Sequence, residues 1–272
     1  MKAPWEIKVE RARELIDSLE NEIKDYFEKT PPVVEMLKVA EPDLYSVVLK
    51  ELHPLPERWG AFVGDVIHNV RSALDSLMFR IITQSAPSRG TEIKEHEIFF
   101  PYATNPTQLR SLMKNDGKWH QGMATEDLFI ALDPHFPYYE DLDLPEDEVI
   151  GATKNHEMTI LRTLSNTDKH RTTNVTICAL DYAGFALPKG VDIRATRWQP
   201  YPWAVGTEIY QTRITGVAEK SQPGLFYKFE VGLERDVRPT DAQSVINRLR
   251  ALLYCAESCI SGLSGFIVAD TD

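Results

Sequence analysis

The chain has 272 residues, of which 43% are hydrophobic and 26% are charged, and its formal net charge is -11. This length and composition are those of an ordered globular protein that can bury a core without disulfides or structural metals. The excess of negative charge repels phosphates, which excludes passive binding to nucleic acid or anionic membranes unless a local basic patch provides it.

The cysteines and the chain ends indicate the compartment. The three cysteines form no CxxC pair and fit neither a disulfide framework nor a thiolate zinc site, so we interpret them as small core residues. Charged residues interrupt the N-terminal segment where a signal peptide needs an apolar run, and Glu257 breaks the apolar stretch near the C-terminus. We therefore expect a cytoplasmic protein that does not associate with membranes.

The first half of the chain contains mostly helical patterns. Apolar residues at three-to-four spacing follow Pro4 and predict an amphipathic helix that the Pro31-Pro32 pair ends. The β-branched content of residues 44–49 favours a strand. A helix is predicted over residues 57–82, and the stretch that follows reads as surface loops with a short helix near 106–114. Further helices are predicted at 125–132 and 155–171.

The second half changes character. Apolar and polar residues alternate between turn signals over residues 173–234, which predicts an antiparallel sheet. A capping-box pattern at residues 240–243 then predicts the start of a C-terminal helix. We predict an α+β fold of one domain, residues 1–272. Its helical bundle (N-terminal, 57–82, 155–171 and C-terminal helices) covers about 1–171 and 236–272, with a sheet insertion at about 172–235.

The helix 57–82 has a polar face of unusual composition. His68 and Asp75 lie opposite the apolar positions, flanked by Arg71. No Lys or Glu occurs between residues 59 and 80, although these helix-favouring residues usually cover a solvated face. The composition favours a polar face placed against something specific, and a solvated face is the alternative.

A metal site on this helix is a further interpretation. Asp65 and His68 are one turn apart, a spacing that metal sites in helical bundles use. The chain contains no second ExxH motif and no HExxH motif, and one pair supplies only two ligands. We therefore predict no bound metal and no other cofactor. A metal-dependent hydrolase that uses Asp65, His68, Asp75 and His170 stays an alternative.

A second polar motif ends the predicted helix 155–171. Its apolar stripe includes Leu164, and the same spacing then reaches Asp168 and Arg171. We expect Asp168 and Arg171 to pair beside His170, which brings together the ingredients of acid–base or phosphate chemistry. Cations that complement the helix dipole are the structural alternative.

We expect the two motifs to meet, with the polar face of the helix 57–82 against the end of the helix 155–171. Asp75 would then accept hydrogen bonds from Arg171 or His170, because buried charges need partners. Asp168 would accept hydrogen bonds in the same way from Arg71 or His68 of the first helix. The candidate catalytic residues of this centre are His68, Arg71, Asp75, Asp168, His170 and Arg171.

The motifs HNxRSALDxL (His68–Leu77) and NxDKHR (Asn166–Arg171), with Phe100-Pro101 between them, resemble a widespread set of uncharacterised bacterial and phage proteins. That set looks distantly similar to HEPN helical-bundle domains, many of which are ribonucleases in toxin–antitoxin, abortive-infection and CRISPR-linked defence systems. The resemblance implies a HEPN-like homodimer in phage or defence biology. Arg162 and His170 are further apart than the arginine and histidine of HEPN nucleases.

Three functions are open at this point, and only two of them are enzymatic. The sequence favours an interaction or ligand-binding module, because the acidic charge repels RNA and the nuclease spacing is absent. Its partner would be a protein bound at Glu140–Glu148, where six of nine residues are acidic. The alternatives are a metal-independent HEPN-like ribonuclease acting on RNA and the metal-dependent hydrolase.

Overall fold

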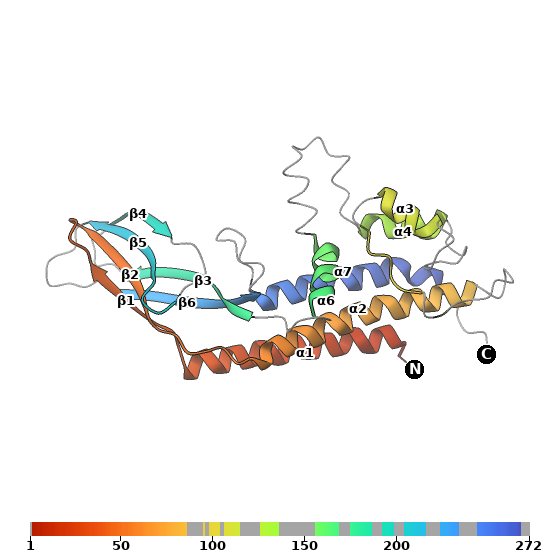
Figure 1. The fold of residues 1–272 in the computed structure, drawn as a ribbon, viewed down its shortest axis with the longest axis horizontal. Helices are drawn as coiled ribbons and strands as arrows, with labels where there is room; N and C mark the ends of the chain where they lie inside the picture. The colour runs from red at the N-terminus through yellow and green to blue at the C-terminus, as the bar shows by residue number, and fades with distance from the viewer. Residues whose placement is uncertain are drawn as a thin grey trace. The chain divides into compact units, whose positions relative to one another are not determined.

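A computed structural model shows how the predicted elements are arranged (Figure 1). The structure describes residues 2–85, 95, 98–103, 106–114, 126–135, 156–168, 175–186, 192–198, 204–215, 224–233 and 244–267. Two compact units are present, a helical unit of residues 1–17, 61–173 and 249–272 and a sheet unit of residues 18–60 and 174–248. Each unit combines segments that are far apart in the sequence.

The described part of the chain has three long helices, α1 (Pro4–Lys29), α2 (Arg58–Ser85) and α7 (Val245–Leu263). Residues 4–17, 61–85 and 249–263 of these helices belong to the helical unit. Ion pairs join α1 to α7, with Arg13 paired to Glu257 and Arg250 Nη2 3.6 Å from Asp17 Oδ1. The shorter helices are α3 (Pro106–Lys114), α4 (Glu126–Leu132), the 3-10 turn η3 (Asp133–His135), α6 (Glu157–Asp168) and the 3-10 turn η5 (Ser264–Phe266).

The apolar face of α2 holds the helical unit together. Its positions recur at three-to-four spacing, as expected for one face of a helix. All of them are at most 3% exposed: Val63, Val66, Val70, Ala73, Leu74, Leu77 and Ile81. Each fully buried valine or leucine side chain contributes about 1.5–3 kcal/mol of hydrophobic free energy, so this face is a major source of stability. None of the helices in the described residues is long and apolar enough to cross a membrane.

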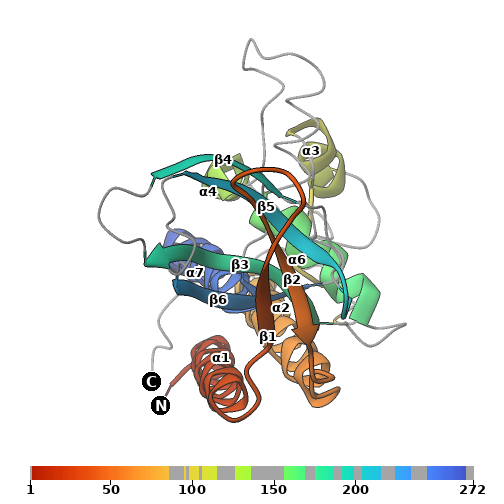
Figure 2. The same cartoon turned by 90° about the vertical axis from the view of Figure 1, so that its left-hand side faces the viewer.

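The sheet unit contains two antiparallel sheets (Figure 2). The larger has the strand order β1-β2-β5-β4, from β1 (Val33–Lys38), β2 (Leu44–Glu51), β4 (Asp192–Trp198) and β5 (Glu208–Thr215). The smaller pairs β3 (Val175–Ala186) with β6 (Gly224–Leu233). The central pairing of the larger sheet sets Ser46 of β2 opposite Gln211 of β5.

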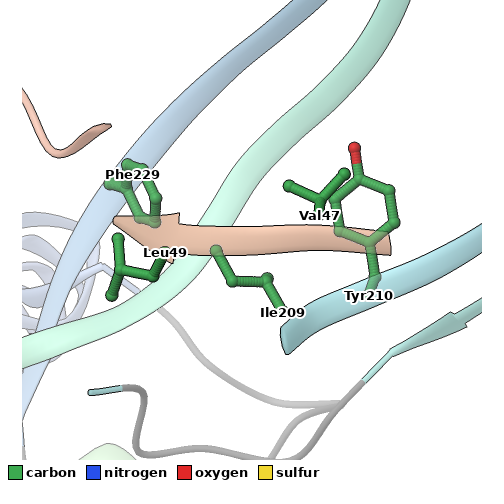
Figure 3. Packing of buried hydrophobic residues seen from close by; sticks show 5 residues of the cluster. All are labelled: Val47, Leu49, Ile209, Tyr210 and Phe229. Carbon is green, nitrogen blue, oxygen red and sulfur yellow. The ribbon is translucent and has the colours of Figure 1, made fainter. Parts of the chain in front are cut away.

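The core of the sheet unit lies where the two sheets meet (Figure 3). Val47 and Leu49 alternate along β2 and so lie on the same face, where they pack with Ile209, Tyr210 and, from the other sheet, Phe229. Each of these side chains is at most 6% exposed. The partly buried apolar side chains around them are Phe27, Val34, Met36, Leu52 and Leu55.

The predicted α+β fold, a helical bundle with an antiparallel sheet, is confirmed. One difference is that β1 and β2 precede α2 in the chain and still form half of the larger sheet, because β2 pairs with β5. The sheet is therefore larger than the predicted insertion at 172–235. Residues 240–243 lie outside the described part, and α7 begins at Val245, after Ser244 Oγ accepts the Asn247 amide at 3.2 Å. The prediction of a single domain stays a prediction.

Candidate functional site

Asp75 connects α2 to a segment that follows it in the chain. Its Oδ1 accepts a hydrogen bond from the backbone amide of Phe100, with 2.8 Å between nitrogen and oxygen. Phe100 is fully buried, so its amide needs an acceptor inside the protein. The carboxylate therefore fixes residues 98–103 against α2.

Arg71 lies one turn before Asp75 and contacts three groups. Its Nη1 donates to Ser165 Oγ of α6 at 3.0 Å. Its Nε lies 3.7 Å from Asp75 Oδ2. The guanidinium carbon is 4.9 Å from the centre of the Tyr102 ring, a cation–π contact. One guanidinium thus connects α2, α6 and the segment 98–103.

Tyr102 is the buried aromatic residue of this centre. It is 9% exposed and packs edge-on against Phe100, with 5.2 Å between ring centroids. Burial raises its pKa well above the usual value, and the nearby Asp75 carboxylate raises it further. Within the described residues its hydroxyl has no hydrogen-bond partner. The phenol is therefore neutral at physiological pH.

His68 occupies the outer part of the same helix face. The residue is exposed. Its Nε2 lies 3.4 Å from Ser72 Oγ, a long contact one turn along the helix. The imidazole is thus open to solvent, whereas Arg71 and Asp75 are partly covered by other segments.

The second motif is described up to the end of α6. Leu161 and Leu164 are buried, which confirms the predicted apolar stripe. Asp168 is the last residue of α6, and its side chain lies outside the described part of the structure, as do His170 and Arg171. The predicted pairing of Asp168 with Arg171, and the contacts of both with the first motif, stay predictions.

The predicted meeting of α2 with the helix of the second motif is confirmed at one contact. Arg71 and Ser165 are 94 residues apart in sequence and share a hydrogen bond. Ser165 is itself buried, at 5% exposed. Asp75 lies beside Arg71 and accepts a hydrogen bond from the Phe100 amide.

Three residues of this centre were missing from the sequence-based set of candidate catalytic residues: Phe100, Tyr102 and Ser165. Ser165 lies three residues before Asp168, on the face that continues the leucine stripe, and this periodicity was the available signal. Tyr102 follows the Phe100-Pro101 pair by one residue, so the resemblance pointed to its segment without giving it a role. We name the set Arg71, Asp75, Phe100, Tyr102 and Ser165 the Arg71–Asp75 centre.

No family model, curated protein or solved structure matches this chain. The chemistry of the site is therefore argued from its own geometry. Across the described residues, no three His, Cys, Asp or Glu side chains are grouped so that they could hold a metal ion. What the Arg71–Asp75 centre offers is a carboxylate, a guanidinium and a buried phenol, which bind one another or the backbone and hold three segments together.

Proposed function

We propose that the chain is a HEPN-like interaction module, acting in phage or defence biology, in which the Arg71–Asp75 centre is structural. The observation that carries the proposal is the hydrogen bond from the Phe100 amide to Asp75. The Asp75 carboxylate accepts from this amide and lies beside Arg71, so its described contacts hold the segment 98–103 against α2. The two charges of the centre compensate each other.

The surface beside the centre supports binding to another protein. Phe79 lies one turn beyond Asp75 on α2, Phe99 directly precedes Phe100, and each of these phenylalanines is 37% exposed. Exposed aromatic side chains are enriched where proteins bind one another. We expect the first partner to be a second copy of the chain, since HEPN-like bundles pair through helices. The acidic stretch at 140–148, proposed to bind a protein, lies outside the described residues.

One observation favours the ribonuclease alternative. His68 offers an exposed imidazole three residues from a guanidinium, and such a pair could move a proton and hold a phosphate. His170 and Arg171, which this alternative also needs, lie outside the described residues. The metal-dependent hydrolase gains no support from the described residues.

The two functions are separated by comparing the purified wild type with His68→Gln and Asp75→Asn in RNA cleavage and in urea unfolding. If the protein is an interaction module, the wild type should cleave RNA no more than the His68→Gln variant does. Asp75→Asn should then lower the urea unfolding midpoint. Cleavage that disappears in His68→Gln while the unfolding midpoint stays unchanged would establish the ribonuclease instead.

Self-association is measured by light scattering. We expect the wild type to be a dimer. If changing both Phe79 and Phe99 to serine makes it monomeric, the dimer interface lies beside the Arg71–Asp75 centre. The matched control is Ile130→Ser on α4, because Ile130 is also an exposed apolar residue of the helical unit, 60% exposed. A wild type that stays monomeric at high concentration contradicts the dimer.

A further inference from the structure

The helix α7 carries two cysteines one turn apart. Cys255 and Cys259 are at positions i and i+4, whose Cβ atoms are roughly 5–6 Å apart in a regular helix. The two differ in accessibility: Cys259 is 0% exposed, whereas Cys255 is half-buried. Both thiols are free. Cys255 is thus partly accessible to solvent and its neighbour is inside the core.

The two thiols shift each other's pKa because they lie one turn apart. The neighbouring Cys259 thiol lowers the pKa of Cys255 against the opposing effects of burial and of the Glu157 carboxylate. The neighbouring Cys255, together with burial, raises the pKa of Cys259. Cys255 is therefore the more readily ionised thiol, and the thiolate is the nucleophilic form of cysteine.

We propose that Cys255 and Cys259 form an oxidisable dithiol, a modification site that takes hydrogen peroxide or a related hydroperoxide as its substrate. Cys255 is the attacking residue and Cys259 the resolving residue. A partly accessible cysteine next to a second cysteine is the arrangement that redox-sensitive proteins use. This inference rests on α7 alone and holds whether or not the proposed function is correct.

The reaction proceeds in two balanced steps. The Cys255 thiolate attacks one oxygen of hydrogen peroxide, the O–O bond breaks, and the departing hydroxide takes up a proton to become water. Cys255 is then a sulfenic acid. The Cys259 sulfur attacks the Cys255 sulfur, the S–O bond breaks, and the departing hydroxide leaves as water with the Cys259 proton. Two thiols and one peroxide give one disulfide and two waters, with peroxide as the oxidant.

The disulfide would alter α7 where it adjoins the Arg71–Asp75 centre. A disulfide needs Cβ atoms about 3.5–4.5 Å apart, closer than a regular helical turn places them, so this turn must distort. Both cysteines interact electrostatically with the Tyr102 phenol. We therefore expect oxidation of the two cysteines to change the packing around Tyr102 and Arg71.

The test uses the full chain, reduced and then titrated with hydrogen peroxide, with free thiols alkylated afterwards. Trypsin cuts after Arg250, and no Lys or Arg follows, so the peptide 251–272 contains both cysteines and no other. We expect this peptide to lose both alkylation sites and to have a mass lower by two hydrogen atoms. Cys178 serves as the internal comparison, because its thiol belongs to another peptide.

Two variants assign the roles. Cys259→Ala should stop at the sulfenic acid, which a dimedone label detects on Cys255, and Cys255→Ser should leave Cys259 reduced. The matched control Cys178→Ala should oxidise like the wild type. Circular dichroism verifies that each variant is folded. The proposal is overturned if, in the wild type, the peptide 251–272 keeps both thiols at peroxide concentrations that already oxidise Cys178, or if Cys255 and Cys259 form only intermolecular disulfides.

Discussion

Replacing Asp75 with alanine tests whether the Arg71–Asp75 centre is structural. The variant removes the acceptor of the buried Phe100 amide, and a hydrogen bond to a charged group contributes about 1.5–3 kcal/mol. It also removes the Arg71 pair, which is 3.7 Å long and partly exposed, so that contact adds only about 0.3–0.5 kcal/mol. We expect a loss of about 2–3 kcal/mol in the free energy of unfolding.

The measurement is urea unfolding followed by far-UV circular dichroism. Asp65→Ala is the matched control, because Asp65 is an exposed aspartate on the same helix. Both substitutions replace aspartate with alanine and therefore raise the helix propensity equally. Asp75→Asn keeps an oxygen acceptor and should lose less, about 1 kcal/mol. If Asp75→Ala and Asp65→Ala differ by less than about 0.5 kcal/mol, the carboxylate does not hold the segment 98–103 and the structural interpretation fails.

A double-mutant cycle extends the same measurement to the second motif. Asp75→Asn combined with Arg171→Gln tests the predicted contact that lies outside the described residues. Coupling above about 0.5 kcal/mol would place Arg171 beside Asp75, and additive effects would mean that the two residues do not interact.

Three further predictions concern other parts of the structure. Tyr102→Phe removes a buried hydroxyl that has no partner among the described residues, so urea unfolding should show stability unchanged or raised by up to about 1 kcal/mol; a clear loss would reveal a partner. Burial lowers the pKa of His135 and His156, so both favour the neutral form when folded. The free energy of unfolding is then highest above the ordinary pKa of 6.5 and decreases as the pH falls below it. Over this pH range the urea midpoint of His135→Gln should decrease less than that of the wild type. An equal decrease in both proteins contradicts the assignment of this pH dependence to His135. Phe229→Ala should cost the sheet unit about 3–5 kcal/mol in urea unfolding, whereas Val205→Ala at an exposed site should change little.

The helical elements were predictable because their signal is local. The apolar positions of α2 repeat within one turn, and the burial of Val63 and Leu77 follows that repeat. The pairing of β2 with β5 has no such signal, since it joins segments that no short window contains. Alternation along a strand indicates which residues share a face but not which strand lies beside them.

The candidate site was predictable in part for a related reason. Arg71 and Asp75 could be named because short polar residues replace the usual Lys and Glu on that helix face. The acceptor role of Asp75 could not be named, because its partner is the amide of Phe100 and any residue except proline carries an amide. Tyr102 was missed because a buried aromatic ring is ordinary core composition until its neighbours are known.

The pairing of β2 with β5 also constrains how the chain can fold during synthesis. The Ser46 hydroxyl donates to Glu208, a residue 162 positions later. β2 therefore cannot pair with β5 until the ribosome has produced most of the chain. Contacts of such long sequence separation slow folding, and unpaired strand edges promote aggregation until β5 is synthesised. Chaperone demand should therefore be highest before β5 emerges.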